Sequence, residues 1–162
     1  MFIDYNSMPS DSRVWIYQSN RELSVKEEEI ISEKLIGFIN NWQRHGDDLK
    51  GSFILKYHHF IVLFVDENYN NVSGCSIDAS VNLMKKFEEE FNIDLTNKMN
   101  ISFKDFENIN VVSMSDFKKY ALEKKISAET IVFNNMVTSK EEFENNWEVK
   151  AVNSWHKRFL AL

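Results

Sequence analysis

The segment Ser73–Asp78, which reads Ser-Gly-Cys-Ser-Ile-Asp, has the residue types best suited to chemistry in this chain. It stands between an expected strand and an expected helix, where free backbone N–H groups and the helix dipole favour an anion. A thiol there ionises more readily, which would make Cys75 a nucleophile. A second reading is a small anion site built from Gly74, Cys75 and Ser76. A third is structural: Gly74 makes a turn, Cys75 packs as a small apolar residue and Asp78 caps the helix.

Two adjacent histidines, His58 and His59, are the candidate general bases. Apolar runs at residues 52–57 and 60–65 flank them and predict an antiparallel hairpin. Neighbouring residues of a strand point to opposite faces, so the pair cannot jointly chelate one metal ion. One imidazole reaching Cys75 across the end of the sheet would form a Cys–His pair, which Asp78 would assist. The alternative is a polar turn with one exposed and one hydrogen-bonded imidazole.

The composition argues against several classes of function. One cysteine and four scattered histidines favour neither a metal site nor an internal disulfide, and we expect no cofactor. The phosphate-binding pattern GxxxxGK[ST] is absent, so we do not expect ATPase activity, because no loop would position the phosphates and Mg²⁺. The formal net charge of -6 argues against nucleic acid as the main partner.

We expect a cytoplasmic protein without a membrane span. No apolar run reaches the roughly 18 to 20 residues that a bilayer crossing needs. The first residues do not have the basic and then apolar pattern of a secretory signal. A single unpaired thiol suits a reducing compartment.

The C-terminal segment places aromatic and cationic residues close together in an acidic chain. Aromatic and Arg side chains are good interface anchors, because they bury a large area at a low cost in rotamer entropy. The segment predicts a docking surface for an acidic protein partner, and the alternative is that its aromatic residues close over the core. The candidate partner-binding residues are Trp147, Trp155, Lys157, Arg158 and Phe159.

Hydrophobic periodicity predicts alternating strands and helices. The capping box of Ser24 and Glu27 opens the first helix, which is expected to end near Trp42. Ser115 is expected to cap a short helix. The expected strands are residues 13–18, 52–57, 60–65, 108–113 and 130–137, with a short irregular strand within 93–106; the expected helices are 24–42, a second from Asp78, 116–125, 139–147 and a last one within 149–162.

This order predicts an α+β fold with a ferredoxin-like βαββαβ core, in which helices cover one face of an antiparallel sheet. A C-terminal helical extension would follow this core. We expect residues 1–12 to be a flexible lead-in and residues 13–162 to form a single domain.

The stretches SRVWIYQSNRELS (12–24), SGCSIDASVNLMKKFE (73–88) and NSWHKRF (153–159) resemble a small family of uncharacterised Bacteroidetes proteins. Its members are often labelled ABC transporter ATPases. This chain has neither the phosphate-binding loop nor the LSGGQ-like signature that such an ATPase needs. The resemblance therefore implies a cytoplasmic bacterial protein, and it implies no activity and no functional residues.

Two functions remain open. The first is a non-enzymatic interaction module, an adaptor or accessory subunit of a larger assembly such as the transcription or translation machinery. The second is a small thiol-dependent enzyme or anion-binding protein centred on Cys75. The oligomeric state does not follow from the sequence.

Overall fold

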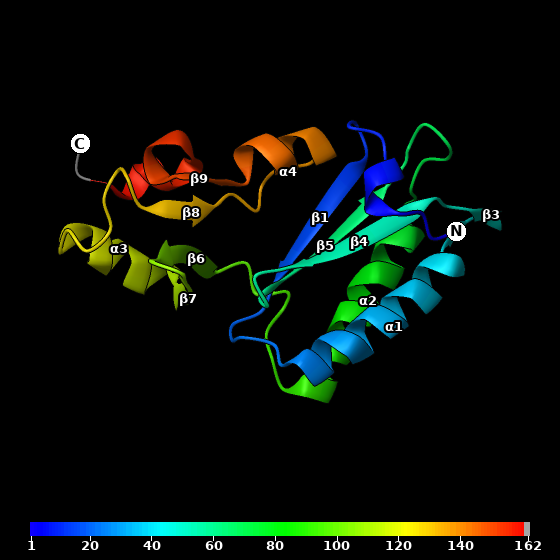
Figure 1. Cartoon of the computed structure of the whole chain (residues 1–162), viewed down its shortest axis with the longest axis horizontal. Helices are drawn as coiled ribbons and strands as arrows, with labels where there is room; N and C mark the ends of the chain where they lie inside the picture. Colours follow the sequence, from blue (N-terminus) through cyan, green and yellow to red (C-terminus); the bar gives the residue numbers. More distant parts are fainter. Residues whose placement is uncertain (161–162) are drawn as a thin grey trace. The chain divides into compact units, whose positions relative to one another are not determined.

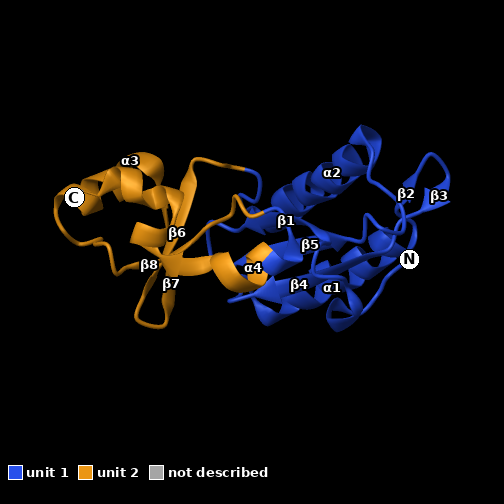
Figure 2. Cartoon of the chain, turned by 90° about the horizontal axis from the view of Figure 1, so that it is seen from above, with its two compact units in different colours: residues 1–96, 138–141 blue, residues 97–137, 142–162 orange. Residues whose placement is uncertain are grey.

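The computed structural model describes residues 1–160 and divides them into two compact units (Figure 2). Unit 1 comprises residues 1–96 and 138–141. Unit 2 comprises residues 97–137 and the rest of the described chain from residue 142. The division into two units does not test whether residues 13–162 form a single domain, so that expectation stays a prediction.

Unit 1 is built on a three-stranded antiparallel sheet with the strand order β1-β5-β4. All six residues of the central strand are buried, as expected for an apolar run between two neighbours. Leu63 of that strand lies opposite Trp15 on one side and Phe53 on the other. This register confirms the predicted hairpin. The strands are β1 (Arg13–Gln18), β4 (Gly51–Lys56) and β5 (Phe60–Val65); a small separate sheet pairs β2 (Gln43–Arg44) with β3 (Asp47–Asp48).

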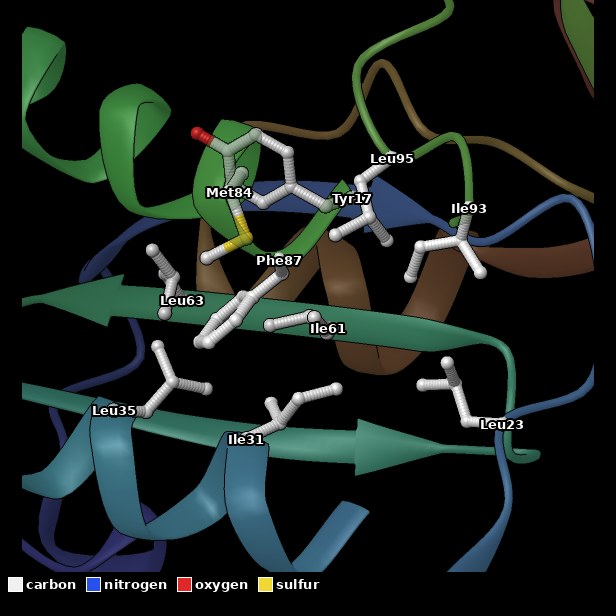
Figure 3. Packing of buried hydrophobic residues seen from close by; sticks show 10 residues of the cluster. All are labelled: Tyr17, Leu23, Ile31, Leu35, Ile61, Leu63, Met84, Phe87, Ile93 and Leu95. Atoms are coloured by element: carbon white, nitrogen blue, oxygen red, sulfur yellow. The ribbon is translucent and has the colours of Figure 1, made fainter. Parts of the chain in front are cut away.

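Two helices, α1 (Val25–Asn40) and α2 (Gly74–Phe91), lie side by side on one face of this sheet (Figure 1). Each helix buries a stripe of residues three or four positions apart, because that spacing follows the helical turn. Figure 3 shows the side chains of both helices pointing toward the central strand. The shared core comprises Tyr17, Leu23, Ile31, Leu35, Ile61, Leu63, Met84, Phe87, Ile93 and Leu95.

Residues 1–12 make defined contacts within unit 1. Phe2 forms a parallel bridge with Gly51. Met8 is 4% exposed, and its carbonyl oxygen accepts a hydrogen bond of 2.8 Å from Lys140 Nζ. A 3-10 helix, η1 (Tyr5–Ser7), lies between these contacts. The expected flexibility of this segment stays a prediction, and these contacts argue against it.

Unit 2 has its own four-stranded antiparallel sheet with the order β7-β6-β8-β9. The fully buried Phe117 of the helix α3 packs in a core with Ile101 and Val132. The elements are β6 (Asn100–Asp105), β7 (Asn108–Ser113), α3 (Met114–Leu122), β8 (Ile131–Phe133), α4 (Lys140–Asn146), β9 (Glu148–Lys150), η2 (Ala151–Asn153) and η3 (Trp155–Phe159), with α4 extending across the division between the units.

The α+β class is confirmed by these antiparallel sheets and by the four α-helices within residues 1–160. The ferredoxin-like topology is not confirmed. The first three strands have the order that this plan requires, but the next long strand, β6, belongs to the sheet of unit 2. The order of strands and helices along the sequence was therefore insufficient to predict the topology, because the same order is compatible with one sheet or with two.

Several local expectations need correction. The last helix expected within 149–162 is replaced, over the described residues, by β9 and the short 3-10 helices η2 and η3. Ser113, and not Ser115, caps α3, because its side chain accepts the N–H of Asp116. The strand expected at 130–137 is limited to β8.

Candidate functional site

Cys75 lies in the first turn of α2 and is exposed. The side chain of Ser73 caps this helix by accepting the N–H of Ser76 at 3.2 Å. Asp78 was expected to be the cap; that prediction is wrong, because the helix begins four residues earlier and Asp78 is an exposed residue within it. The early start follows from Ser73, which is a strong N-cap residue type.

Ser76, a member of the expected anion site, is engaged inside unit 1. It is 1% exposed, and its hydroxyl donates to the carbonyl oxygen of Gln43 at 2.9 Å. Its own carbonyl oxygen accepts from Trp42 Nε1 at 2.9 Å. Of the three residues of the expected anion site, only Gly74 and Cys75 are exposed. The anion-site reading stays a prediction, without the hydroxyl group that it relied on.

The two histidines lie in the turn between β4 and β5. Tyr57 and His58 both have a positive φ (53° and 56°), and His59 N–H donates to the carbonyl oxygen of Lys56 at 3.0 Å. Positive φ at both central residues is the pattern of a type I′ turn, and because Lys56 lies opposite Phe60, the loop between the strands comprises three residues, 57–59. His59 is 8% exposed, and its Nδ1 lies 2.9 Å from the carbonyl oxygen of Tyr57.

His58 is exposed and pairs through Nδ1 with the Glu28 carboxylate. That hydrogen bond, and then the charge of Glu28, raise the pKa of His58. Next to it, Arg21 forms two hydrogen bonds with Glu27, of 2.9 and 2.7 Å. The Arg21 guanidinium lowers the pKa of Glu27 to about 2. Arg21 and His58, the two bases of this corner, are thus each paired with a carboxylate of α1.

A shallow pocket of about 370 Å³ opens at this corner, lined by residues 21–25, Glu27 and His58. Arg21 also donates to the carbonyl oxygen of Phe91 at 2.6 Å, which ties the end of α2 to the start of α1. The geometry is that of a structural clamp between two helix ends.

The structure does not bring Cys75 and the histidines together. The start of α2 contacts Trp42, beyond the end of α1, whereas its end contacts Arg21, before the start of α1. The two helices are therefore antiparallel (Figure 1), and His58 lies beside the first turn of α1. Cys75 is separated from the Phe91 end of α2 by roughly 24 Å of helix. The expected Cys–His pair is not assembled.

Trp147, the first residue of the expected docking surface, is 3% exposed. Its ring packs 4.8 Å from Phe133 and 4.9 Å from Phe143, between centroids, and its Nε1 donates to Asn135. It is a core residue of unit 2.

The other docking candidates are divided between core and surface. Trp155 is half-buried and stacks on His156 with 3.9 Å between ring centroids. Phe159 packs against Phe117. Lys157 and Arg158 are exposed. This outcome matches the alternative reading, in which the aromatic residues close over the core and the cations stay in solvent.

The sequence reasoning missed the hairpin tip of unit 2, formed by Asp105, Phe106 and Glu107. Phe106 has a φ of 57° and is 92% exposed. The flanking carboxylates are exposed and form no ion pair among residues 1–160. A phenylalanine between two acidic residues, at the junction of two expected strands, was the available signal.

A groove of about 670 Å³ lies beside this tip. Ile126, which is 2% exposed, is among its lining residues, together with Tyr120 and Lys125. Its lining residues are Phe103, Lys104, Asp105, Phe106, Asn110, Tyr120, Lys125, Ile126, Glu129, Thr130 and Ile131.

Within residues 1–160, no helix has the length and apolarity needed to cross a membrane. In that same part of the chain, no three His, Cys, Asp or Glu residues are grouped so that they could hold a metal ion. No protein family model, curated protein or solved structure matches the chain. The resemblance to the Bacteroidetes family therefore stays a prediction.

Proposed function

We propose that this chain is a protein-interaction module that docks through the hairpin tip of unit 2. The observation that carries the proposal is Phe106, which is 92% exposed and has a φ of 57°. Both features are unfavourable in the isolated chain, and burial in a complex would offset them.

The conformational cost follows from the turn. β6 and β7 are joined by only two residues, Phe106 and Glu107, with Asp105 opposite Asn108. A positive φ at the first of two loop residues is the position that type II′ turns give to glycine. A bulky residue there costs about 1–3 kcal/mol. Leaving the ring in water forgoes about another 2 kcal/mol of burial.

The tip chemistry specifies the kind of partner. An exposed aromatic ring between Asp105 and Glu107 fits an apolar pocket with Lys or Arg at its rim, because the carboxylates would face opposite charges. A basic partner is also consistent with the net charge of -6. The predicted acidic partner of the C-terminal segment has less support, because Trp147 is a core residue.

Photocrosslinking in the source organism tests the proposal. Phe106 is replaced there by a photoreactive analogue of phenylalanine, which forms a covalent bond to a protein that lies against it. The matched control carries the same residue at Leu122, which is 68% exposed in the same unit. We expect the variant with the photocrosslinker at position 106 to form one discrete crosslinked product with another protein. The variant with the photocrosslinker at position 122 should form no product of the same mass. The adduct is identified by mass spectrometry, and its partner is purified.

Binding of the purified partner then decides the proposal. We expect Phe106→Ala to weaken binding by roughly 30-fold, as for a central interface anchor, and Leu122→Ala to change it less than about twofold. Asp105→Asn with Glu107→Gln should reduce the salt dependence of binding. Equal adducts from both positions, or wild-type affinity of Phe106→Ala, would overturn the proposal.

The thiol-enzyme alternative has no comparable support. Cys75 is exposed, but the histidines that were to assist it lie at the other end of α2.

A further inference from the structure

Strand β7 is the outer strand at one edge of the sheet of unit 2. Among residues 1–160, β7 pairs only with β6, and apart from the bonds of helix α3, which Ser113 caps, no other backbone hydrogen bond reaches residues 108–113. In an antiparallel pair, alternate residues direct their N–H and C=O groups away from the partner strand. About half of the backbone N–H and C=O groups of β7 therefore point away from β6.

The other long sheet edges of the described chain are protected. β1 begins with Arg13 and is bridged there by Ser139. β4 is bridged by Phe2 at its start and ends in Lys56. At the opposite edge of the sheet of unit 2, β9 is three residues long, and two of them, Glu148 and Lys150, are charged. Charges, short length and covering segments are the usual protections of an edge.

β7 has none of these protections. Its sequence, Asn-Ile-Asn-Val-Val-Ser, is six residues long, contains no charge, glycine or proline, and is half β-branched. Although 27% of the residues of this chain are charged, β7 has no charged residue. Two copies of β7 can therefore lie side by side without bringing like charges together, so the strand is complementary to itself.

We infer that β7 pairs antiparallel with β7 of a second copy of this chain. A two-fold axis perpendicular to the sheet keeps each face of one copy continuous with the same face of the other, so a residue at the axis lies opposite itself. With Val111 at the axis, Ile109 lies opposite the second copy's Ser113, and the sheet of unit 2 doubles in width. The hairpin tip directly precedes this edge in the chain, but residues 105–107 take no part in the pairing, so the inference does not depend on the proposed function.

The test is the oligomeric state of the full chain by sedimentation equilibrium, from about 10 µM to about 1 mM. We expect a reversible monomer–dimer equilibrium for the wild type. Val111→Lys and Val111→Glu each place like charges opposite one another and should raise the dissociation constant roughly tenfold or more. Val111→Thr, which keeps the β-branch without a charge, should dimerise like the wild type.

An equimolar mixture of the Lys and Glu variants completes the test. It should recover the dimer, since the opposite charges then face each other; unfolded variants would not recover it. A wild type that is monomeric up to about 1 mM overturns the inference and leaves this edge to a strand of another protein. A dimer that is unchanged by both charged variants also overturns it.

Discussion

Acid should destabilise unit 2 through one buried histidine, His156. Its ring is 1% exposed, stacks on Trp155 and shares a 2.8 Å hydrogen bond with Ser154. Burial, with a smaller contribution from the charge of Arg158, lowers the pKa of His156 to about 4. The folded protein therefore holds this imidazole in its neutral form.

The direction and the size of this effect of pH on the unfolding free energy follow from proton linkage. Between pH 6.5 and about 4, the unfolded chain binds a proton at this site that the folded chain does not. The contribution of His156 to stability is therefore complete above pH 6.5, falls as the pH is lowered through this window, and stays low below it. A pKa that moves from 6.5 to about 4 corresponds to about 3 kcal/mol of unfolding free energy.

The assay is urea unfolding at several pH values between 7 and 4, followed by tryptophan fluorescence, for the wild type and His156→Phe. The variant keeps an aromatic ring between Trp155 and Phe117 but leaves the Ser154 hydroxyl without its partner, which costs about 1–2 kcal/mol at pH 7. We expect the two stability curves to cross as the pH falls. A difference between wild type and variant that does not change with pH would refute the reasoning.

Four further substitutions test three local features of the structure. Phe106→Gly should stabilise the chain by about 1 kcal/mol in urea unfolding, because glycine tolerates the positive φ; a loss of stability would contradict the turn geometry. Arg21→Met should cost about 1 kcal/mol at pH 7, and the part of this cost that comes from the ion pair should be lost as Glu27 protonates between pH 4.5 and about 2, whereas the part from the hydrogen bond to Phe91 remains; a cost that does not change with pH would contradict the ion pair. Ser73→Ala should cost about 1 kcal/mol and Asp78→Ala less than about 0.5 kcal/mol in the same measurement; the reverse order would restore Asp78 as the cap.

The strands and the first cap were the most predictable features. The ranges expected for β1, β5 and β7 match the structure residue by residue. The capping box of Ser24 and Glu27 is also present, with both reciprocal hydrogen bonds. These features depend on side-chain periodicity and on contacts three residues apart, so a short window of sequence contains the whole cause.

The candidate site was less predictable, because its members are far apart in the sequence. Whether Cys75 meets His58 depends on the relative direction of α1 and α2, which no local pattern encodes. Phe106 was overlooked because exposure and backbone angle are properties of the folded hairpin.

The sequence by itself determined the α+β class, the positions of the strands β1, β4, β5 and β7 and the absence of a nucleotide-binding loop, since these follow from residue types and short spacings. Only the tertiary structure decided that β6 pairs with β8 and not with β1, that Trp147 is a core residue and that β7 keeps an unpaired edge. The physical reason is that strand pairing and burial are settled by competition among distant segments for the same apolar surface and the same backbone hydrogen bonds.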